Sequence, residues 1–302
     1  MPIERNAEKI TLSLPSAGAS AEILFFGATV ISWKSAGASG NSDPTERLFL
    51  SKKSALDGSK PVRGGIPVVF PFFGAPTDPA HMKMSSHGFA RSSTWEWGGE
   101  VLDNESGVSV RLKLNPTPEI SQVFSPEFSL TYVVTLAAHQ LSTDLHVHNP
   151  SSDTALTHQA LLHTYISTAP HSSTTVSVTP LKGLTYFDKV AGTTKQEERE
   201  KVDVKEFTDS VYRGAGSGER PDGGQYKVRW GPEGAETGLD VRATNFGDVV
   251  VWNPREEAGS KLGDMEVGGW DRFVCVEPGI ASYWNTIAPG EKWIGQQVLT
   301  AI

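Results

Sequence analysis

Hydrophobic and polar residues alternate in short stretches along most of the chain. The alternation is clearest in six of them: Val108–Leu114, Phe128–Leu136, Leu141–His148, Gly238–Arg242, Asp248–Trp252 and Phe273–Glu277. Successive side chains of a β-strand point to opposite faces, so this pattern predicts strands with one buried and one polar face. Half-buried strands of this kind are typical of antiparallel sheets.

Helical periodicity is almost absent. We predict one short helix at Lys52–Asp57 and a turn or two of helix within Lys195–Lys205. Two stretches rich in Gly, Ser and Pro, Ser35–Pro44 and Gly214–Gly224, are predicted to be loops. With 30 Gly and 19 Pro spread along the chain and no change of composition to mark a boundary, we expect one all-β sandwich domain over residues 1–302.

The composition excludes several classes of function. The 302 residues carry a net charge of −8, which argues against nucleic-acid or anionic-membrane partners, because both need a basic surface. The single cysteine, Cys275, excludes an intramolecular disulfide and a multi-cysteine metal site. We see no secretory signal and no stretch near the ~18 apolar residues of a membrane helix. We therefore expect a cytosolic, monomeric protein.

Two segments near the first third of the chain place arginines beside glycines. Arg63 precedes Gly64-Gly65, where the backbone can approach a ligand closely, and its planar fork suits phosphate or carboxylate. His87 and Arg91 follow in a second segment and would share a face if that segment were a strand. The alternatives are a structural ion pair for Arg63 and surface-loop positions for the other two. Together the arginines predict an anion clamp.

Two later segments place a titratable group inside an apolar strand. His163 interrupts a hydrophobic run and is expected to be buried, either as a hydrogen-bonded core residue or as a catalyst. Glu277 ends the strand before Pro278-Gly279, where a carboxylate is poorly solvated unless it faces a cleft. It is either a general base or a carboxylate that satisfies a turn.

Motifs for cofactors and metals are absent. There is no glycine-rich dinucleotide or phosphate loop after a strand, and no HExxH or GxSxG sequence. His146 and His148 lie on one face of a predicted strand, but no third ligand is near, so we expect no metal and no cofactor. Among the eight Trp, Trp252 and Trp270 are candidate sugar platforms, as are Phe72 or Phe73.

Five motifs in order resemble the hexose-6-phosphate mutarotase branch of the aldose 1-epimerase (galactose mutarotase-like) superfamily: VRGGIPVVFPFFG, SHGFAR, LLHTYIS, GLTYFDK and FVCVEPG. The resemblance runs from Gly27–Trp33 to Trp293. It implies a large antiparallel β-supersandwich with few short helices, and an isomerase that needs no cofactor. The implied substrate is a small phosphosugar, glucose 6-phosphate or a related hexose 6-phosphate.

The resemblance also implies roles for individual residues. His163 matches the catalytic acid and Glu277 the catalytic base, while Arg63 and Arg91 match substrate-binding positions, with His87 beside them. Asp209 resembles the acidic residue that holds sugar hydroxyls. The chain departs from the family pattern at Ser86, where a Gln often stands, and at Ser210, where a basic residue is expected.

Anomer exchange breaks and re-forms the C1–O5 bond of the sugar. A base takes the proton of the C1 hydroxyl, an acid protonates O5, and the open-chain aldehyde rotates before the ring closes. Three alternatives stay open: a mutarotase for unphosphorylated aldoses, a non-catalytic sugar-binding or regulatory protein, and a glycosidase or lyase. A glycosidase would normally need a second catalytic carboxylate, for which Asp209 is the one candidate.

Overall fold

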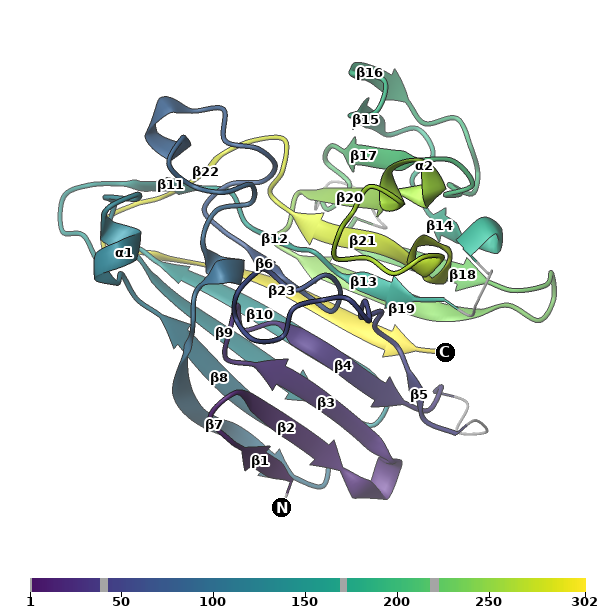
Figure 1. Cartoon of the computed structure of the whole chain (residues 1–302), viewed down its shortest axis with the longest axis horizontal. Helices are drawn as coiled ribbons and strands as arrows, with labels where there is room; N and C mark the ends of the chain where they lie inside the picture. Colours follow the sequence, from purple (N-terminus) through teal and green to yellow (C-terminus); the bar gives the residue numbers. More distant parts are fainter. Residues whose placement is uncertain (1, 39–42, 169–172, 218–222) are drawn as a thin grey trace.

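The computed structural model describes residues 2–38, 43–168, 173–217 and 223–302, and β-strands dominate it (Figure 1). One sheet, the N-terminal sheet, has the order β1 (Ile3–Arg5), β2 (Lys9–Leu14), β3 (Ala19–Leu24), β4 (Val30–Ser35) and β5 (Thr45–Glu46). A second, the long sheet, has the order β14 (Ser177–Thr179), β18 (Gln225–Trp230), β19 (Thr237–Thr244), β23 (Lys292–Ala301), β10 (Gln140–His148), β9 (Ser129–Leu136), β8 (Gly107–Leu114) and β7 (Glu96–Asn104).

A third sheet, the β21 sheet, has the order β16 (Thr193–Gln196), β15 (Thr185–Asp188), β17 (Thr208–Tyr212), β20 (Asp248–Asn253), β21 (Phe273–Gly279), β12 (Leu161–Leu162) and β6 (Val68–Val69), with β13 (Tyr165–Ser167) also paired to β21. Strands β11 (Leu156–His158) and β22 (Asn285–Ile287) form a separate pair. Within the described residues, all of these strand pairs run antiparallel.

Helices are few and short. The α-helices of the described residues are α1 (Pro118–Ser121) and α2 (Arg255–Gly259), and single 3-10 turns occur at η1 (Pro15–Ala17), η2 (Pro79–His81), η3 (Ala90–Ser92), η4 (Ser173–Thr175) and η5 (Gly269–Arg272). Thr117 caps α1 by accepting from the backbone N–H of Ile120, and Pro118 occupies its first turn. In this part of the chain we find no helix with the length and apolar character to cross a membrane.

All six predicted strands are confirmed, and the alternation sets the burial of β9 and β10, whereas nearly every residue of β20 and β21 is buried, so the polar face predicted for these two strands is wrong. In β10 every second residue, Leu141, Thr143, Leu145 and Val147, is buried, as the pattern predicts. The predicted helices are wrong: residues 52–53 form a turn, 54–56 are irregular and 57 begins a bend, while Lys195 belongs to β16 and no helix follows it within residues 197–205. The predicted loops have no strand or helix at residues 36–38, 43–44, 214–217 and 223–224, whereas residues 39–42 and 218–222 lie outside the described residues.

The main hydrophobic core lies between the long sheet and the two sheets that cover it, with the N-terminal sheet and the β21 sheet over different parts (Figure 1). Strand β21 shows how the β21 sheet takes part. Val274 and Val276 belong to this core, so the side chains of Phe273, Cys275 and Glu277 must point to the opposite face. Glu277 is 1% exposed there. The alternation of one strand thus supplies both core residues and a buried carboxylate on the other face.

Candidate active site

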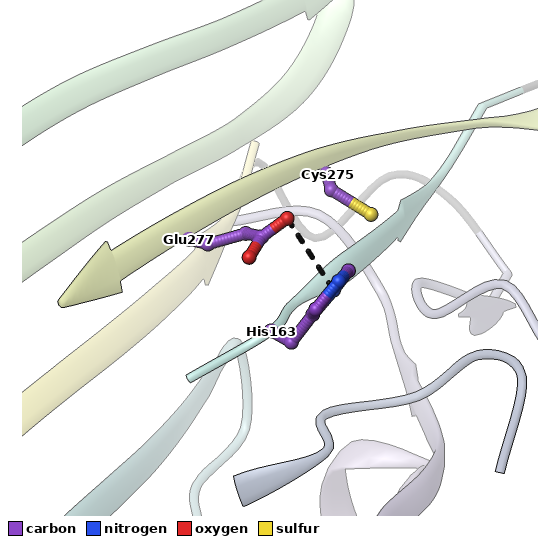
Figure 2. Close-up of side chains that lie close together, drawn as sticks. All are labelled: His163, Cys275 and Glu277. Atoms are coloured by element: carbon purple, nitrogen blue, oxygen red, sulfur yellow. Dashed lines mark ion pairs between the residues drawn. The ribbon is translucent and has the colours of Figure 1, made fainter. Parts of the chain in front are cut away.

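Strand register brings His163 and Glu277 together. Leu161 of β12 pairs with Gly279, and Tyr165 of β13 pairs with Cys275, so the shared register places His163 opposite Glu277. Directly opposed residues of an antiparallel pair carry their side chains on the same face. His163 Nδ1 lies 3.4 Å from Glu277 Oε1 (Figure 2). Two groups 114 positions apart in sequence therefore form one acid–base pair.

Burial shifts the pKa values of Glu277 and His163 in opposite directions. It raises the pKa of the Glu277 carboxyl well above its usual range, with the nearby Asp209 carboxylate adding to the rise. It lowers the pKa of His163 well below its usual range, and the neighbouring His87, Arg91 and Arg63 lower it further. Desolvation always disfavours the charged form, which explains both signs. The proton affinities of acid and base thus shift toward each other, which suits a pair that must exchange roles between ring opening and ring closure.

Arg63 is held in place by two partners. Its Nε donates to Asp264 Oδ1 at 3.1 Å, and its Nη1 donates to the Tyr165 hydroxyl at 3.0 Å. Arg63 thus forms the ion pair that was the structural alternative for it, and it also lines the cavity described below. Gly65, at φ +66°, lets the chain after Arg63 pass close to β4, since a Cβ there would lie 2.1 Å from the carbonyl oxygen of Val30.

His87 lies in a turn and Arg91 in the 3-10 helix η3, so the segment is not a strand and the shared strand face that an extended segment would give does not occur. His87 has a φ of +69°, in the left-handed region, and its Nδ1 accepts from the backbone N–H of Gly74 at 3.2 Å. That bond leaves the ring proton on Nε2 as a donor. Burial and the nearby cations lower the pKa of His87 well below its usual range, so the ring is neutral. A strained, half-buried histidine with a preset donor is typical of a ligand site.

Arg91 lies in η3, and its side chain lines the same cavity as His87. Its Nη2 donates to the carbonyl oxygen of Ser86 at 2.8 Å, while its buried Nε has no hydrogen-bond partner among the described residues. Gly88 permits the tight turn, since a Cβ there would lie 2.2 Å from the carbonyl oxygen of Phe70. Ser86 takes part through its backbone, so the missing Gln side chain of the family pattern does not disturb the position of Arg91.

Asp209 is paired with a cation that the sequence analysis did not assign. Lys189 Nζ lies 3.1 Å from Asp209 Oδ2 and 4.8 Å from the centre of the Phe73 ring. The backbone N–H of Lys189 donates to the carbonyl oxygen of Asp209, which fixes the two strands together. Ser210, the next residue, is buried on the other face of β17, so the basic residue beside Asp209 is Lys189, which directly follows β15. In the sequence, Lys189 is the last residue of the GLTYFDK motif, and this position was the signal that could have identified it as a site residue.

These side chains line one cavity of about 300 Å³, at the small end of the range for ligand sites. All six predicted site residues take part, together with five others; the eleven are Arg63, Phe73, Ser86, His87, Arg91, His163, Lys189, Asp209, Val250, Trp252 and Glu277. Of the candidate sugar platforms, Trp252 and Phe73 line it, while Phe72 and Trp270 are buried elsewhere. A larger cavity of about 750 Å³ near Trp284 is lined by Asp78 and His81, but Asp78 is exposed and His81 is half-buried, unlike the buried pair of His163 and Glu277.

Buried polar atoms without a hydrogen bond indicate that a ligand binds in this cavity. Glu277 Oε2 is buried and makes no hydrogen bond to any described residue, as is also true of Arg91 Nε. Buried polar atoms are normally satisfied, so such exceptions are expected where a substrate supplies the partner. The side chain of Cys275 is buried on the same face of β21 as that of Glu277, packed with Phe49 and Tyr165, and burial raises the pKa of its thiol well above the usual range.

Residues 8–300 match the family model described as aldose 1-epimerase. The chain belongs to the aldose 1-epimerase family, as the motifs and the fold indicate. Two relatives share the name "Putative glucose-6-phosphate 1-epimerase". The one from Cenchrus ciliaris is 28% identical over 93% of this chain and 81% of its own length. The one from Escherichia coli K12 is 29% identical over 85% of this chain and 78% of its own length.

Solved structures confirm the fold. The YeaD protein of Salmonella typhimurium superposes with a TM-score of 0.81 at 22% identity, over 99% of this chain and 92% of that one. A galactose mutarotase-like protein of Clostridium acetobutylicum gives a TM-score of 0.73 at 17% identity, over 99% and 97% of the two chains. The predicted all-β, galactose mutarotase-like architecture is therefore confirmed.

Proposed function

We propose that this epimerase interconverts the α and β anomers of a hexose 6-phosphate, with glucose 6-phosphate as the expected substrate. One observation carries the proposal: a single small cavity contains an opposed acid–base pair, His163 and Glu277, and three cationic side chains, Arg63, Arg91 and Lys189. The names of the curated relatives agree with a phosphorylated hexose.

The chemistry assigns Glu277 and His163 complementary steps. In ring opening, the Glu277 carboxylate takes the proton of the C1 hydroxyl while His163 gives a proton to O5. The C1–O5 bond breaks, C1 becomes an aldehyde, and rotation about C1–C2 exposes its other face. In closure the C5 hydroxyl adds to C1, with His163 taking its proton and Glu277 returning one to the carbonyl oxygen. Protons and electrons balance with no cofactor.

The remaining side chains are suited to holding the two ends of the substrate. Arginine forks give charge-assisted hydrogen bonds to a phosphate dianion. The protein carries a net charge of −8, so it is these local cations that attract the anion. Asp209 can accept from sugar hydroxyls, the Nε2–H of His87 can donate to a sugar oxygen, and the ring of Trp252 offers an apolar face.

Arg91→Ala should lower kcat/KM for glucose 6-phosphate by about 10–100-fold, because it removes a charge-assisted bond of about 1.5–3 kcal/mol. The free hexose has no phosphate and should lose little. The measurement is kcat/KM for both sugars in wild type and variant. Arg229→Ala, which removes an arginine paired with Asp240 on the long sheet, is the matched control and should leave both values unchanged. Equal losses for both sugars would refute a phosphate role.

Arg63→Ala should also weaken glucose 6-phosphate turnover more than glucose turnover, but less selectively. Arg63 holds Asp264 and Tyr165, so its removal also leaves those groups without a partner beside the cavity. We therefore expect a loss on both sugars, with the larger loss on the phosphorylated one. A wild-type ratio of the two kcat/KM values would contradict a contact between Arg63 and phosphate.

Removal of metal ions should not change the rate. The proposed reaction runs on proton transfers between Glu277, His163 and the sugar. Protein treated with EDTA and then dialysed should therefore keep its full rate of glucose 6-phosphate anomer exchange. A loss in EDTA that a divalent ion restores would show that a metal takes part in the reaction.

A further inference from the structure

Three different metal-ligating side chains lie together beside the cavity, two of them lining it and the third, Cys275, buried behind them. The ligand atoms of His163, Cys275 and Glu277 all lie within 4.8 Å of one another, and all three residues are buried (Figure 2). Proton transfer by His163 and Glu277 gives Cys275 no part in the reaction. The thiol nevertheless lies beside both of them.

We propose that these three residues form a binding site for Zn²⁺ or a similar borderline transition-metal ion, and that the bound ion inhibits the enzyme. The inhibition rests on the proposed function, whereas the binding does not.

The pairing of the strands brings the side chains of His163, Cys275 and Glu277 to one place. Cys275 and Glu277 are two residues apart on β21 and therefore share a face. His163 stands opposite Glu277 in the paired register, and the backbone N–H of Val276 donates to the carbonyl oxygen of Thr164 beside it. Sites built on paired strands hold their ligands more firmly than sites on loops.

The ligand set selects the kind of ion. One imidazole nitrogen, one thiolate sulfur and one carboxylate oxygen suit Zn²⁺, whereas Mg²⁺ and Ca²⁺ prefer oxygen ligands alone. Around tetrahedral zinc, with metal–ligand distances of about 2.0–2.3 Å, the ligand atoms lie roughly 3.3–3.7 Å apart. The nitrogen–oxygen distance of 3.4 Å already fits. The sulfur lies within 4.8 Å of both other ligand atoms, so it must move closer to them by at most roughly 1–1.5 Å.

The site also has an access route and an unused acceptor. His163 and Glu277 line the cavity, so an ion enters from the substrate side and meets Cys275 behind them. Glu277 Oε2 is buried and makes no hydrogen bond to a described residue, so a cation would satisfy it. Coordination releases the thiol proton of Cys275 to the solvent. A water or a sugar hydroxyl in the cavity would complete four-coordination.

Inhibition follows from which atoms the ion occupies. Glu277 cannot take the C1 hydroxyl proton and His163 cannot protonate O5 while both ligate the metal. Zinc should therefore abolish turnover, and Mg²⁺ should have no effect at the same concentration. Removing one direct ligand should weaken binding at least as much as the 10–100-fold typical of losing a supporting partner.

The test begins with metal-free wild type, titrated with Zn²⁺ and Mg²⁺ while anomer exchange is followed. Cys275→Ala should keep its turnover in the absence of metal and show an inhibition midpoint raised on the order of 10–100-fold or more. Cys275→Ser serves if the alanine variant folds poorly. The control, His146→Gln combined with His148→Gln, removes the histidine pair of β10 and should remain fully sensitive to zinc.

Cobalt titration tests binding without reference to activity. Co²⁺ bound to wild type should give a thiolate-to-cobalt charge-transfer absorption in the near ultraviolet, and both Cys275 variants should lack it. No such band in wild type, or zinc inhibition unchanged in the Cys275 variants, would overturn the site. If the band forms but wild type does not catalyse anomer exchange, the proposed function fails and the metal site stands.

Discussion

Glu277→Gln should slow the catalysed anomer exchange of glucose 6-phosphate by about 10²–10⁴-fold, the usual contribution of one acid or base. The amide keeps the size and polarity of the carboxyl but accepts no proton from the C1 hydroxyl. Glu277 is 1% exposed, and burial raises the pKa of its carboxyl, so the neutral amide should be tolerated without loss of stability. The loss should therefore appear in kcat, with a wild-type melting temperature.

A matched control separates catalysis from burial. Glu197 is also nearly fully buried, but it is satisfied by Arg199 and by the Tyr212 hydroxyl, away from the cavity. Glu197→Gln should lower stability, because it breaks a charge-assisted pair, and should leave kcat unchanged. Polarimetry or NMR exchange spectroscopy gives the rates. A folded Glu277→Gln variant that turns over at the wild-type rate would remove Glu277 from the mechanism.

His163→Gln should reduce kcat by a similar factor, about 10²–10⁴-fold, because glutamine cannot deliver a proton to O5. Acid and base act in the same step, so their effects should not add. The double variant, His163→Gln with Glu277→Gln, should be about as slow as the slower single variant. The rates of the three variants under identical conditions provide this comparison.

The same substitution at His139, which lies outside the cavity near Ala36, is the control and should leave kcat unchanged. If the loss of kcat in the double variant equals the product of the two single losses, His163 and Glu277 act independently. That result would contradict a shared proton-transfer step.

Much of the fold followed from the sequence because strand alternation is a local signal. Strands β8, β9 and β10 needed only the period of two, and the burial of His163 and Glu277 followed from the apolar residues around them. Local pattern also misled. Residues 52–57 have a helical pattern in isolation but are irregular in the structure. The Ser51 hydroxyl just before them donates a hydrogen bond to the Glu266 carboxylate, which is far away in the sequence. Tertiary contacts of that kind leave no periodic trace.

The site could be predicted only in part. Resemblance to the family supplied its six residues, but the pairing of His163 with Glu277 depends on the register of β21 with β12 and β13, which no local pattern encodes. Lys189 was missed because its role depends on β15 pairing with β17, which puts Asp188 opposite Ser210. The convergence of Cys275 with the catalytic pair arises from the same register.

The most direct measurement is the α-to-β exchange rate of glucose 6-phosphate with and without the purified protein, recorded by NMR exchange spectroscopy. We expect cross-peaks between the two anomeric protons to grow in proportion to protein concentration, far above the spontaneous rate, and to be weaker for glucose under the same conditions. Exchange no faster than the spontaneous rate for either sugar would contradict a mutarotase acting through His163 and Glu277.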